Sequence, residues 1–192
     1  MQYPIVLAGT YHKTGTLWIH RVMRGTARAL GIDYHMNFYQ NNRLDTKPPA
    51  PSILFDDHAL FPEQLAAYEV VGFRMIRDPR DVVISGAHYH LRSDEEWLHC
   101  PEDHLGGQSY SQAINASGGG QAQYCFEMQH TAADTIKQMT EPSEFVSTFQ
   151  TVRYEDLMVD TDFSRFKALV KALGFSLLER RHAVKADRKS VV

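Results

Sequence analysis

Short apolar runs bounded by turn-forming residues recur along the chain, and each predicts a β-strand. The first run, residues 4–8, is apolar throughout, which is typical of a strand buried on both faces of a parallel sheet. Similar runs at 52–55, 69–76 and 148–154 predict three further strands. Segments of helical periodicity separate them. The alternation predicts an α/β fold, in which a central, mainly parallel sheet lies between helical layers as a three-layer sandwich.

The predicted helices have recognisable starts and ends. Apolar side chains recur at helical spacing over residues 17–30, and Gly31 is suited to close that helix. Asp78 and Pro79 form the sharpest helix start in the chain, because aspartate caps free backbone N–H groups and proline fits the first helical position. Four further segments predict helices: 62–68, 79–91, 121–139 and 163–173.

Three segments lack a clear periodicity. Residues 37–52 are rich in asparagine and proline, and residues 105–123 are rich in glycine, so both predict exposed loops. Residues 179–189 are strongly charged and predict either a terminal helix or a loose tail.

Composition limits the classes of function open to the chain. Its 192 residues are expected to form a single domain over 1–192, and its net charge of −3 argues against nucleic acid as a partner. Any bound anion must therefore be held by a local site. No apolar run reaches the ~18 residues of a membrane span, and residues 1–15 lack the features of a signal peptide, so a cytoplasmic protein without membrane partners is expected. Cys100 and Cys125 are expected to be free thiols.

The segment between the first strand and the first helix is suited to bind phosphate. Backbone N–H groups at a helix start point toward an anion and lie at the positive end of the helix dipole. Gly15 would let the backbone approach that anion closely, Thr14 and Thr16 would add hydroxyl donors, and Lys13 would add a positive charge. The alternative is an ordinary turn with solvated side chains. The segment differs from the G-x-x-x-x-G-K-[ST] loop of nucleoside triphosphate-binding proteins, because its lysine precedes the second glycine.

Residues 13–18 read Lys-Thr-Gly-Thr-Leu-Trp and resemble the 5′-phosphosulfate loop of sulfotransferases that use 3′-phosphoadenosine 5′-phosphosulfate (PAPS). Members of that family commonly read K-[ST]-G-T-T-W, so Leu17 stands where a hydroxyl residue is usual. The resemblance implies a P-loop-like loop that binds PAPS through all six residues: Lys13, Thr14, Gly15, Thr16, Leu17 and Trp18.

A second anion site is predicted where the third strand meets its helix. Arg77 ends the strand and Ser85 lies two helical turns into the helix, so a guanidinium and a hydroxyl could hold one phosphate. The alternative is an arginine paired with Asp81 and a serine bonded to its own helix. Residues 73–85 resemble the family's 3′-phosphate motif, R-[ND]-P-x-D-x-x-x-S. The resemblance implies that Arg77 and Ser85 bind the 3′-phosphate of PAPS.

A third, shorter match lies late in the chain. Residues 152–157 read Val-Arg-Tyr-Glu-Asp-Leu and are similar to the family's Y-E-D-[LM] segment. By this resemblance Tyr154 would lie near the adenine base. Family members usually continue into an R-K-G-containing segment that closes over the 3′-phosphate, and this cap is expected to be missing here. Five basic residues are candidates to replace it: Arg180, Arg181, Lys185, Arg188 and Lys189.

Sulfuryl transfer needs a base for the acceptor proton and a cation for the leaving phosphate. Lys13 is the natural cation. His58 is the predicted base, since it follows a strand and lies nineteen residues before Arg77, a placement similar to that of the family's histidine. Two acids, Asp56 and Asp57, precede it where relatives carry a basic residue, and they could orient the imidazole or raise its pKa.

Three other residues are reserve candidates for the base: Asp57, His88 and His90. A zinc site is not favoured, although His99, Cys100, His104 and Cys125 are ligand types, because paired C-x-x-C units are absent.

The sequence as a whole predicts a PAPS-dependent sulfotransferase that moves a sulfuryl group to an acceptor hydroxyl or amine. PAPS would be the donor, its desulfated form 3′-phosphoadenosine 5′-phosphate (PAP) the product, and no metal would be needed. The acceptor is expected to be a small molecule or a glycan. Two alternatives remain open at this point: a PAPS- or PAP-binding protein without turnover, and a small nucleotide kinase-like phosphoryl transferase.

Overall fold

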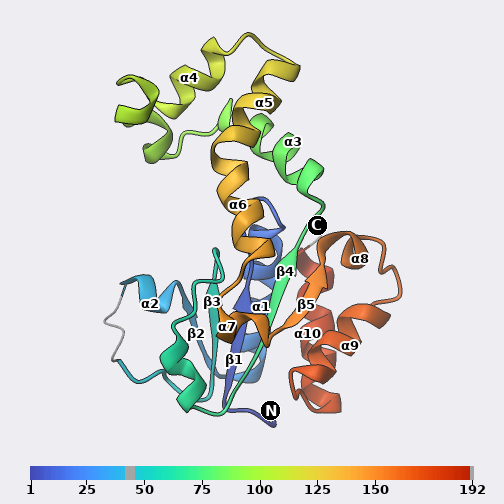
Figure 1. The fold of residues 1–192 in the computed structure, drawn as a ribbon. Helices are drawn as coiled ribbons and strands as arrows, with labels where there is room; N and C mark the ends of the chain where they lie inside the picture. Colours follow the sequence, from blue (N-terminus) through green and yellow to red (C-terminus); the bar gives the residue numbers. More distant parts are fainter. Residues whose placement is uncertain (42–45, 191–192) are drawn as a thin grey trace. The chain divides into compact units, whose positions relative to one another are not determined.

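The computed structural model describes residues 1–41 and 46–190, without the side chains of 41 and 188–190 (Figure 1). The chain divides into two compact units, of which the first comprises Met1–Ile76 with Glu141–Val192 and the second Arg77–Thr140. The single domain expected over 1–192 stays a prediction.

The first unit is built on a five-stranded sheet with the order β2-β3-β1-β4-β5. Its strands are β1 (Ile5–Gly9), β2 (Asp33–Met36), β3 (Ser52–Asp56), β4 (Val70–Ile76) and β5 (Gln150–Arg153). Every neighbouring pair is parallel, which confirms the predicted sheet type. The sequence did not predict β2, because it is short, polar and only half-buried at the sheet edge.

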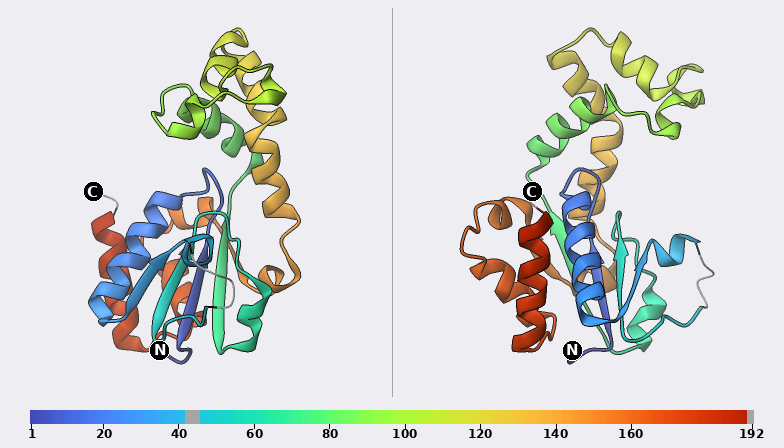
Figure 2. Two further views of the ribbon diagram at one scale, coloured as in Figure 1. Left: turned by 90° about the vertical axis from the view of Figure 1, so that its left-hand side faces the viewer. Right: turned by 180° about the vertical axis from the view of Figure 1, so that it is seen from behind.

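Helices cover both faces of this sheet, and Figure 2 shows α1 and α10 side by side on one of them. That face is covered by α1 (Thr16–Leu30), α9 (Ser164–Ala172) and α10 (Leu177–Ser190), which share one apolar core with alternate strand residues. On the other face, the Phe149 ring lies 2.7 Å from the position that a Cβ at Gly72 would take. Phe149 there packs against Phe61 and against Phe145 of α7 (Glu144–Ser147). The predicted three-layer α/β architecture is therefore confirmed.

The shorter elements of the first unit connect the strands. They are α2 (Phe38–Asn41), the 3₁₀ helix η1 (Glu63–Ala67) and α8 (Tyr154–Met158). The predicted helix over 62–68 is thus a 3₁₀ turn. The loop expected over 37–52 contains α2, and its residues 42–45 lie outside the described residues.

The second unit is helical. Its elements are α3 (Pro79–His90), η2 (Glu96–His99), η3 (Asp103–Leu105), α4 (Tyr110–Ala116), α5 (Gln121–Gln129) and α6 (Thr131–Thr140). The predicted start of α3 is confirmed, since the Asp78 carboxylate accepts a hydrogen bond from the Arg80 backbone N–H at 2.9 Å and Pro79 is the first helical residue. The core of the second unit is formed by Ala87, Leu98, Tyr110 and Ile114.

Two predictions in this unit were wrong. The helix expected over 121–139 is broken at His130, whose backbone leaves the helical region. The loop expected over 105–123 contains α4, which begins with a capping box formed by Ser109 and Gln112.

For residues 179–189, in the first unit, the sequence left open a terminal helix or a loose tail. The structure shows a helix there, α10, which packs along α1.

Candidate functional site

The loop between β1 and α1 is held by its own hydroxyl groups. The Thr14 hydroxyl donates to the Tyr11 carbonyl at 2.9 Å and accepts from the Tyr11 backbone N–H, also at 2.9 Å. The Thr16 hydroxyl donates to the same carbonyl at 3.0 Å and accepts from Thr10 at 3.1 Å. Both threonine hydroxyls predicted to contact phosphate therefore fix the shape of the loop in this structure.

The start of α1 is open to an anion. Its N-cap residue, Gly15, provides no side-chain cap, and the first turn contains no acidic residue. The first backbone N–H groups of a helix have no acceptor within it, so a 15-residue helix that begins uncapped presents free donors at its positive end. Lys13 and Gly15 have positive φ angles of 61° and 100°, which turn the loop tightly before the helix. Leu17 is 71% exposed, so its side chain does not close this site.

Tyr154 lies against this loop. A Cβ at Gly15 would stand 2.8 Å from the Tyr154 ring and 2.8 Å from the methyl of Met75, so only glycine fits there. The Tyr154 ring also meets Trp18 edge-on, with centroids 6.2 Å apart. The structure thus brings together three predicted binding residues from α1, its loop and α8: Gly15, Trp18 and Tyr154.

Trp18 has a partner that the sequence did not predict. Its indole N–H donates to the Asp187 carboxylate of α10 at 2.8 Å. Burial raises the pKa of Asp187, and the hydrogen bond from Trp18 partly offsets this effect. This contact spans 169 residues of sequence and involves a helix start and a helix end, so no local pattern could have indicated it.

His58 lies in a turn attached to the end of β3. The β1 and β3 strands pair with Gly9 opposite Asp56, and the Thr10 N–H donates to the Asp56 carbonyl at 3.0 Å, which sets this turn beside the loop before α1. The His58 side chain is half-buried, and within the described residues its ring makes no hydrogen bond. The turn with His58 and the loop with Lys13 therefore follow two adjacent parallel strands, β3 and β1, at the carboxyl ends of those strands.

Asp56 shapes the turn through backbone contacts. One oxygen of its buried carboxylate accepts from the N–H groups of His58 at 3.0 Å and Leu60 at 2.9 Å, and the other accepts from the Gln40 amide at 3.1 Å. Burial raises the pKa of Asp56, and these hydrogen bonds oppose the shift. The Asp57 carboxylate accepts from Gln40 at 3.4 Å. Asp56 therefore fixes the backbone at His58, and the expected effect of the two acids on the imidazole stays a prediction.

The two residues predicted to bind the 3′-phosphate lie in the second unit. Arg77 directly follows the last residue of β4, and Ser85 is half-buried on α3. The alternative of a serine bonded to its own helix is not seen, since the Ser85 hydroxyl makes no hydrogen bond within the part of the chain that the structure describes. The positions of Arg77 and Ser85 relative to Lys13 stay a prediction.

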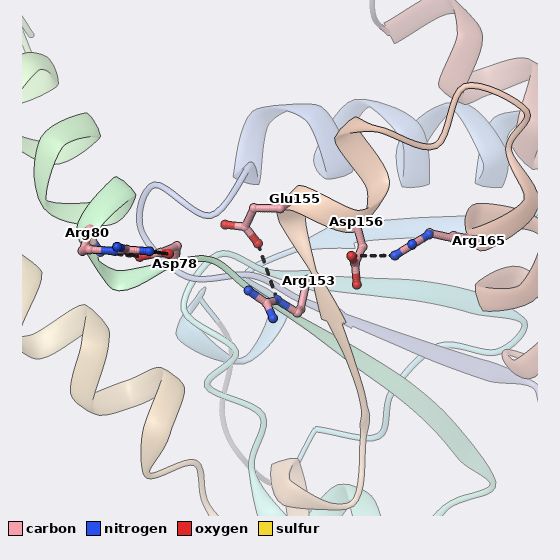
Figure 3. Close-up of polar contacts among 6 residues, drawn as sticks. All are labelled: Asp78, Arg80, Arg153, Glu155, Asp156 and Arg165. Atoms are coloured by element: carbon pink, nitrogen blue, oxygen red, sulfur yellow. Dashed lines mark hydrogen bonds and ion pairs between the residues drawn. The ribbon is translucent and has the colours of Figure 1, made fainter.

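The acids and bases that surround these motifs pair locally (Figure 3). Arg80 binds the Asp78 carboxylate at 2.6 Å beside the start of α3. In the first unit, Arg153 lies 3.8 Å from Glu155, and Arg165 pairs with Asp156. Each of the two acids that follow Tyr154 therefore has an arginine as a neighbour of opposite charge.

The reserve bases differ in accessibility. His90 is fully buried, and its Nδ1 lies 2.8 Å from the Glu127 carboxylate, which also accepts from the Tyr110 hydroxyl at 2.9 Å. That histidine belongs to the core of the second unit. His88 is exposed and lies 3.3 Å from the Tyr124 hydroxyl.

The described residues contain neither a candidate metal site nor a candidate membrane-spanning helix. Across 1–41 and 46–190, no group of three or more histidine, cysteine, aspartate or glutamate side chains is placed to hold a metal ion. Cys100 and Cys125 are both free thiols, as expected. None of the helices in the described segments has the length and apolar character needed to span a bilayer.

No protein-family model matches the chain, and no curated protein matches its sequence. The fold, however, is similar to that of solved structures. Mouse sulfotransferase SULT7A1 complexed with PAP aligns with a TM-score of 0.54 and 16% identity, over 99% of this chain and 64% of that one. Retinol dehydratase in complex with androsterone and inactive cofactor PAP aligns with a TM-score of 0.53 and 13% identity, over 97% and 64% of the two chains.

A second retinol dehydratase structure, in a complex with retinol and PAP, aligns with a TM-score of 0.51 and 14% identity, over 98% of this chain and 65% of that chain. The chain therefore spans just under two thirds of the length of these proteins. Together with the sheet order and the loop before α1, these matches identify a domain with the sulfotransferase fold.

Proposed function

We propose that this chain binds PAPS and transfers its sulfuryl group to a hydroxyl or amine of a small acceptor. The observation that carries the proposal is the uncapped start of α1, where Lys13 and Gly15 bend the loop toward free backbone donors. The resemblance of residues 13–18 to the phosphosulfate loop and the presence of PAP in the similar solved structures support the same ligand.

The residues of the first unit fit the 5′ end of the donor. The uncapped α1 start would bind the phosphosulfate oxygens, and Gly15, at a φ of 100°, provides the tight turn that leads into it. Trp18 and Tyr154, whose rings meet edge-on, would offer aromatic surface for the adenine base. In the second unit, Arg77 and Ser85 would hold the 3′-phosphate through charge-assisted and hydroxyl hydrogen bonds.

The chemistry assigned to the chain's own residues is a proton transfer and a charge stabilisation. PAPS, when bound, supplies a sulfuryl group on a good leaving phosphate. His58 would take the proton of the acceptor hydroxyl as its oxygen forms the bond to sulfur, and the Asp56 carboxylate holds the backbone of that turn. Lys13 would stabilise the charge that develops on the phosphate oxygen as the S–O bond breaks.

Ligand binding separates this proposal from a nucleotide kinase. Isothermal titration with PAP is expected to show saturable binding that is lost in Lys13→Ala, whereas ATP with magnesium should bind much more weakly. Lys171→Ala removes an exposed lysine of α9 and is the matched control, expected to bind PAP as the unchanged chain does. Preference for ATP with magnesium would contradict the proposal.

Turnover separates an enzyme from a binding protein. Transfer of radiolabelled sulfate from PAPS to a panel of phenols, alcohols and amines is expected to occur and to fail in His58→Ala, while that variant still binds PAP. Binding of PAP without transfer to any acceptor class would instead assign the chain as a PAP-binding protein. Full turnover in His58→Ala would refute the role of His58 alone.

A further inference from the structure

A cationic pocket lies between α9 and α10, within the first unit. Its volume is about 520 Å³. It is lined by six side chains: Lys167, Leu177, Arg180, Arg181, Val184 and Lys185. Four of these are basic and none is acidic. The lining contains none of the residues assigned to PAPS under the proposed function, but three of its cations, Arg180, Arg181 and Lys185, are among the residues named from the sequence as candidates to replace the cap over the 3′-phosphate.

Among the described residues, no acid forms an ion pair with the cations of this pocket. The two acids on the described turns of α10 are engaged elsewhere, since Glu179 binds the N-terminal amino group of Met1 at 2.7 Å and Asp187 accepts from Trp18. Within the described residues, none of the four lining cations forms an ion pair. Arg181 and Lys185 stand four residues apart on one helix face, a like-charged pair that is unfavourable in isolation.

In the part of the chain that the structure describes, the other two lining cations donate hydrogen bonds to carbonyl oxygens and to no carboxylate. The Arg180 guanidinium donates to the Ser176 carbonyl at 3.3 Å, and the Lys167 ammonium donates to the Asp162 carbonyl at 2.9 Å. Carbonyl oxygens hold these side chains in place without cancelling their charge. An anion that entered the pocket would therefore meet pre-positioned donors with net positive charge.

The pocket also offers apolar surface. Leu177 is 74% exposed at its rim, and Val184 reaches the apolar core beneath it. The aliphatic stems of the arginine and lysine side chains add further apolar area. A hydrophilic anion such as inorganic sulfate would leave this surface exposed to water, whereas a ligand with an alkyl or ring body would bury it and bind more tightly for that reason.

We propose that this pocket binds a small amphipathic anion, a single molecule with a sulfate, phosphate or carboxylate head and an apolar body. Charge complementarity selects the head, and Leu177 and Val184 select the body. The volume falls within the ~300–1,000 Å³ range of small-molecule sites, which favours a discrete soluble ligand over an extended lipid surface. No residue of the loop before α1 contributes to the pocket, so the proposal assigns it a ligand other than PAPS, and competition with PAP tests that assignment.

Octyl sulfate below its micelle concentration is a suitable probe of the chain in isothermal titration. Saturable binding at one site is expected. Octyl glucoside, which has the same alkyl chain without the charge, and inorganic sulfate, which has the charge without the chain, should each bind at least about tenfold more weakly. Equal binding of octyl glucoside would overturn the proposal.

Two substitutions test the assignment to this pocket. The double variant Arg181→Gln, Lys185→Gln is expected to lose about tenfold or more in octyl sulfate affinity, and Leu177→Asn should weaken the probe but not inorganic sulfate. These side chains are exposed or at the rim, so the variants should keep the thermal midpoint of the unchanged chain. Lys171→Gln on α9, outside the pocket, is the matched control and should bind normally. Unchanged affinity in the double variant would refute the site.

Competition experiments distinguish this inference from the proposed function. Octyl sulfate should still bind in the presence of saturating PAP and in Lys13→Ala. Displacement by PAP would show instead that α10 cations belong to the donor site. Anionic phosphatidylserine vesicles should not compete with octyl sulfate, and stronger binding to vesicles than to the probe would replace a small-molecule site with a membrane surface.

Discussion

The buried carboxylate of Glu127 is expected to be the most sensitive polar position in the second unit. It has no solvent exposure, and one of its oxygens contacts His90 at 2.8 Å and Tyr110 at 2.9 Å. Burial raises the pKa of the Tyr110 phenol, so this hydroxyl stays a donor at neutral pH. Glu127→Ala removes both hydrogen bonds and leaves a void beside Gly86.

The expected cost follows from these contacts. Each buried polar group that loses its acceptor costs about 1–3 kcal/mol, and the lost methylene adds about 0.8 kcal/mol. The two lost partners and the methylene together amount to about 3–7 kcal/mol. A whole domain is stable by only about 5–15 kcal/mol, so Glu127→Ala should remove a large part of the stability of this unit.

Urea unfolding followed by tryptophan fluorescence can measure this loss. Trp97 lies in the second unit with its ring centroid 5.2 Å from that of His90, so a Trp18→Phe background makes the fluorescence report on this unit alone. Glu127→Gln preserves the side-chain shape and should cost less than Glu127→Ala. Glu96→Ala, an exposed glutamate of the same unit, should change stability by less than about 0.5 kcal/mol. If Glu127→Ala unfolds at the same urea concentration as Glu96→Ala, the buried hydrogen bonds do not stabilise the unit as argued.

Two further predictions concern the candidate site. Gly15→Ala places a Cβ 2.8 Å from Tyr154 and Met75 at a φ of 100°, so PAP affinity measured by titration should fall by about tenfold or more, and retained affinity would argue against the loop as the binding site. For Asp56, the folded-state pKa is raised above its ordinary value of 3.8, so the folded state binds more protons than the unfolded state in the window above that value. Its contribution to the free energy of unfolding therefore falls as pH rises through that window and stays lower at neutral pH. Asp56→Asn should lack this fall. A comparison of the thermal midpoints of the two proteins between about pH 4 and pH 7 would detect the difference, and parallel curves would refute the predicted contribution of Asp56.

The sequence alone determined the local features of this protein. The buried parallel strands follow from uninterrupted apolar runs, and the start of α3 follows from Asp78 and Pro79, because both signals act within a few residues. The anion-binding potential of residues 13–18 was equally local, since a glycine-containing turn before a helix suffices to predict it. Strand β2 carried too few apolar residues to be predicted, and its place in the sheet comes from pairing with β3.

Only the tertiary structure decided which distant residues meet. Tyr154 lies against Gly15, and Asp187 binds Trp18, although more than a hundred residues separate each pair. The break of the predicted helix at His130 likewise accompanies the packing of the second unit around its core. The capping box of Ser109 and Gln112 is, in contrast, a local signal for the start of α4 that the sequence analysis missed. The physical reason is that hydrophobic periodicity records which side of an element is buried but carries no information on its partner, which is selected by the shape and charge of side chains far away in the sequence.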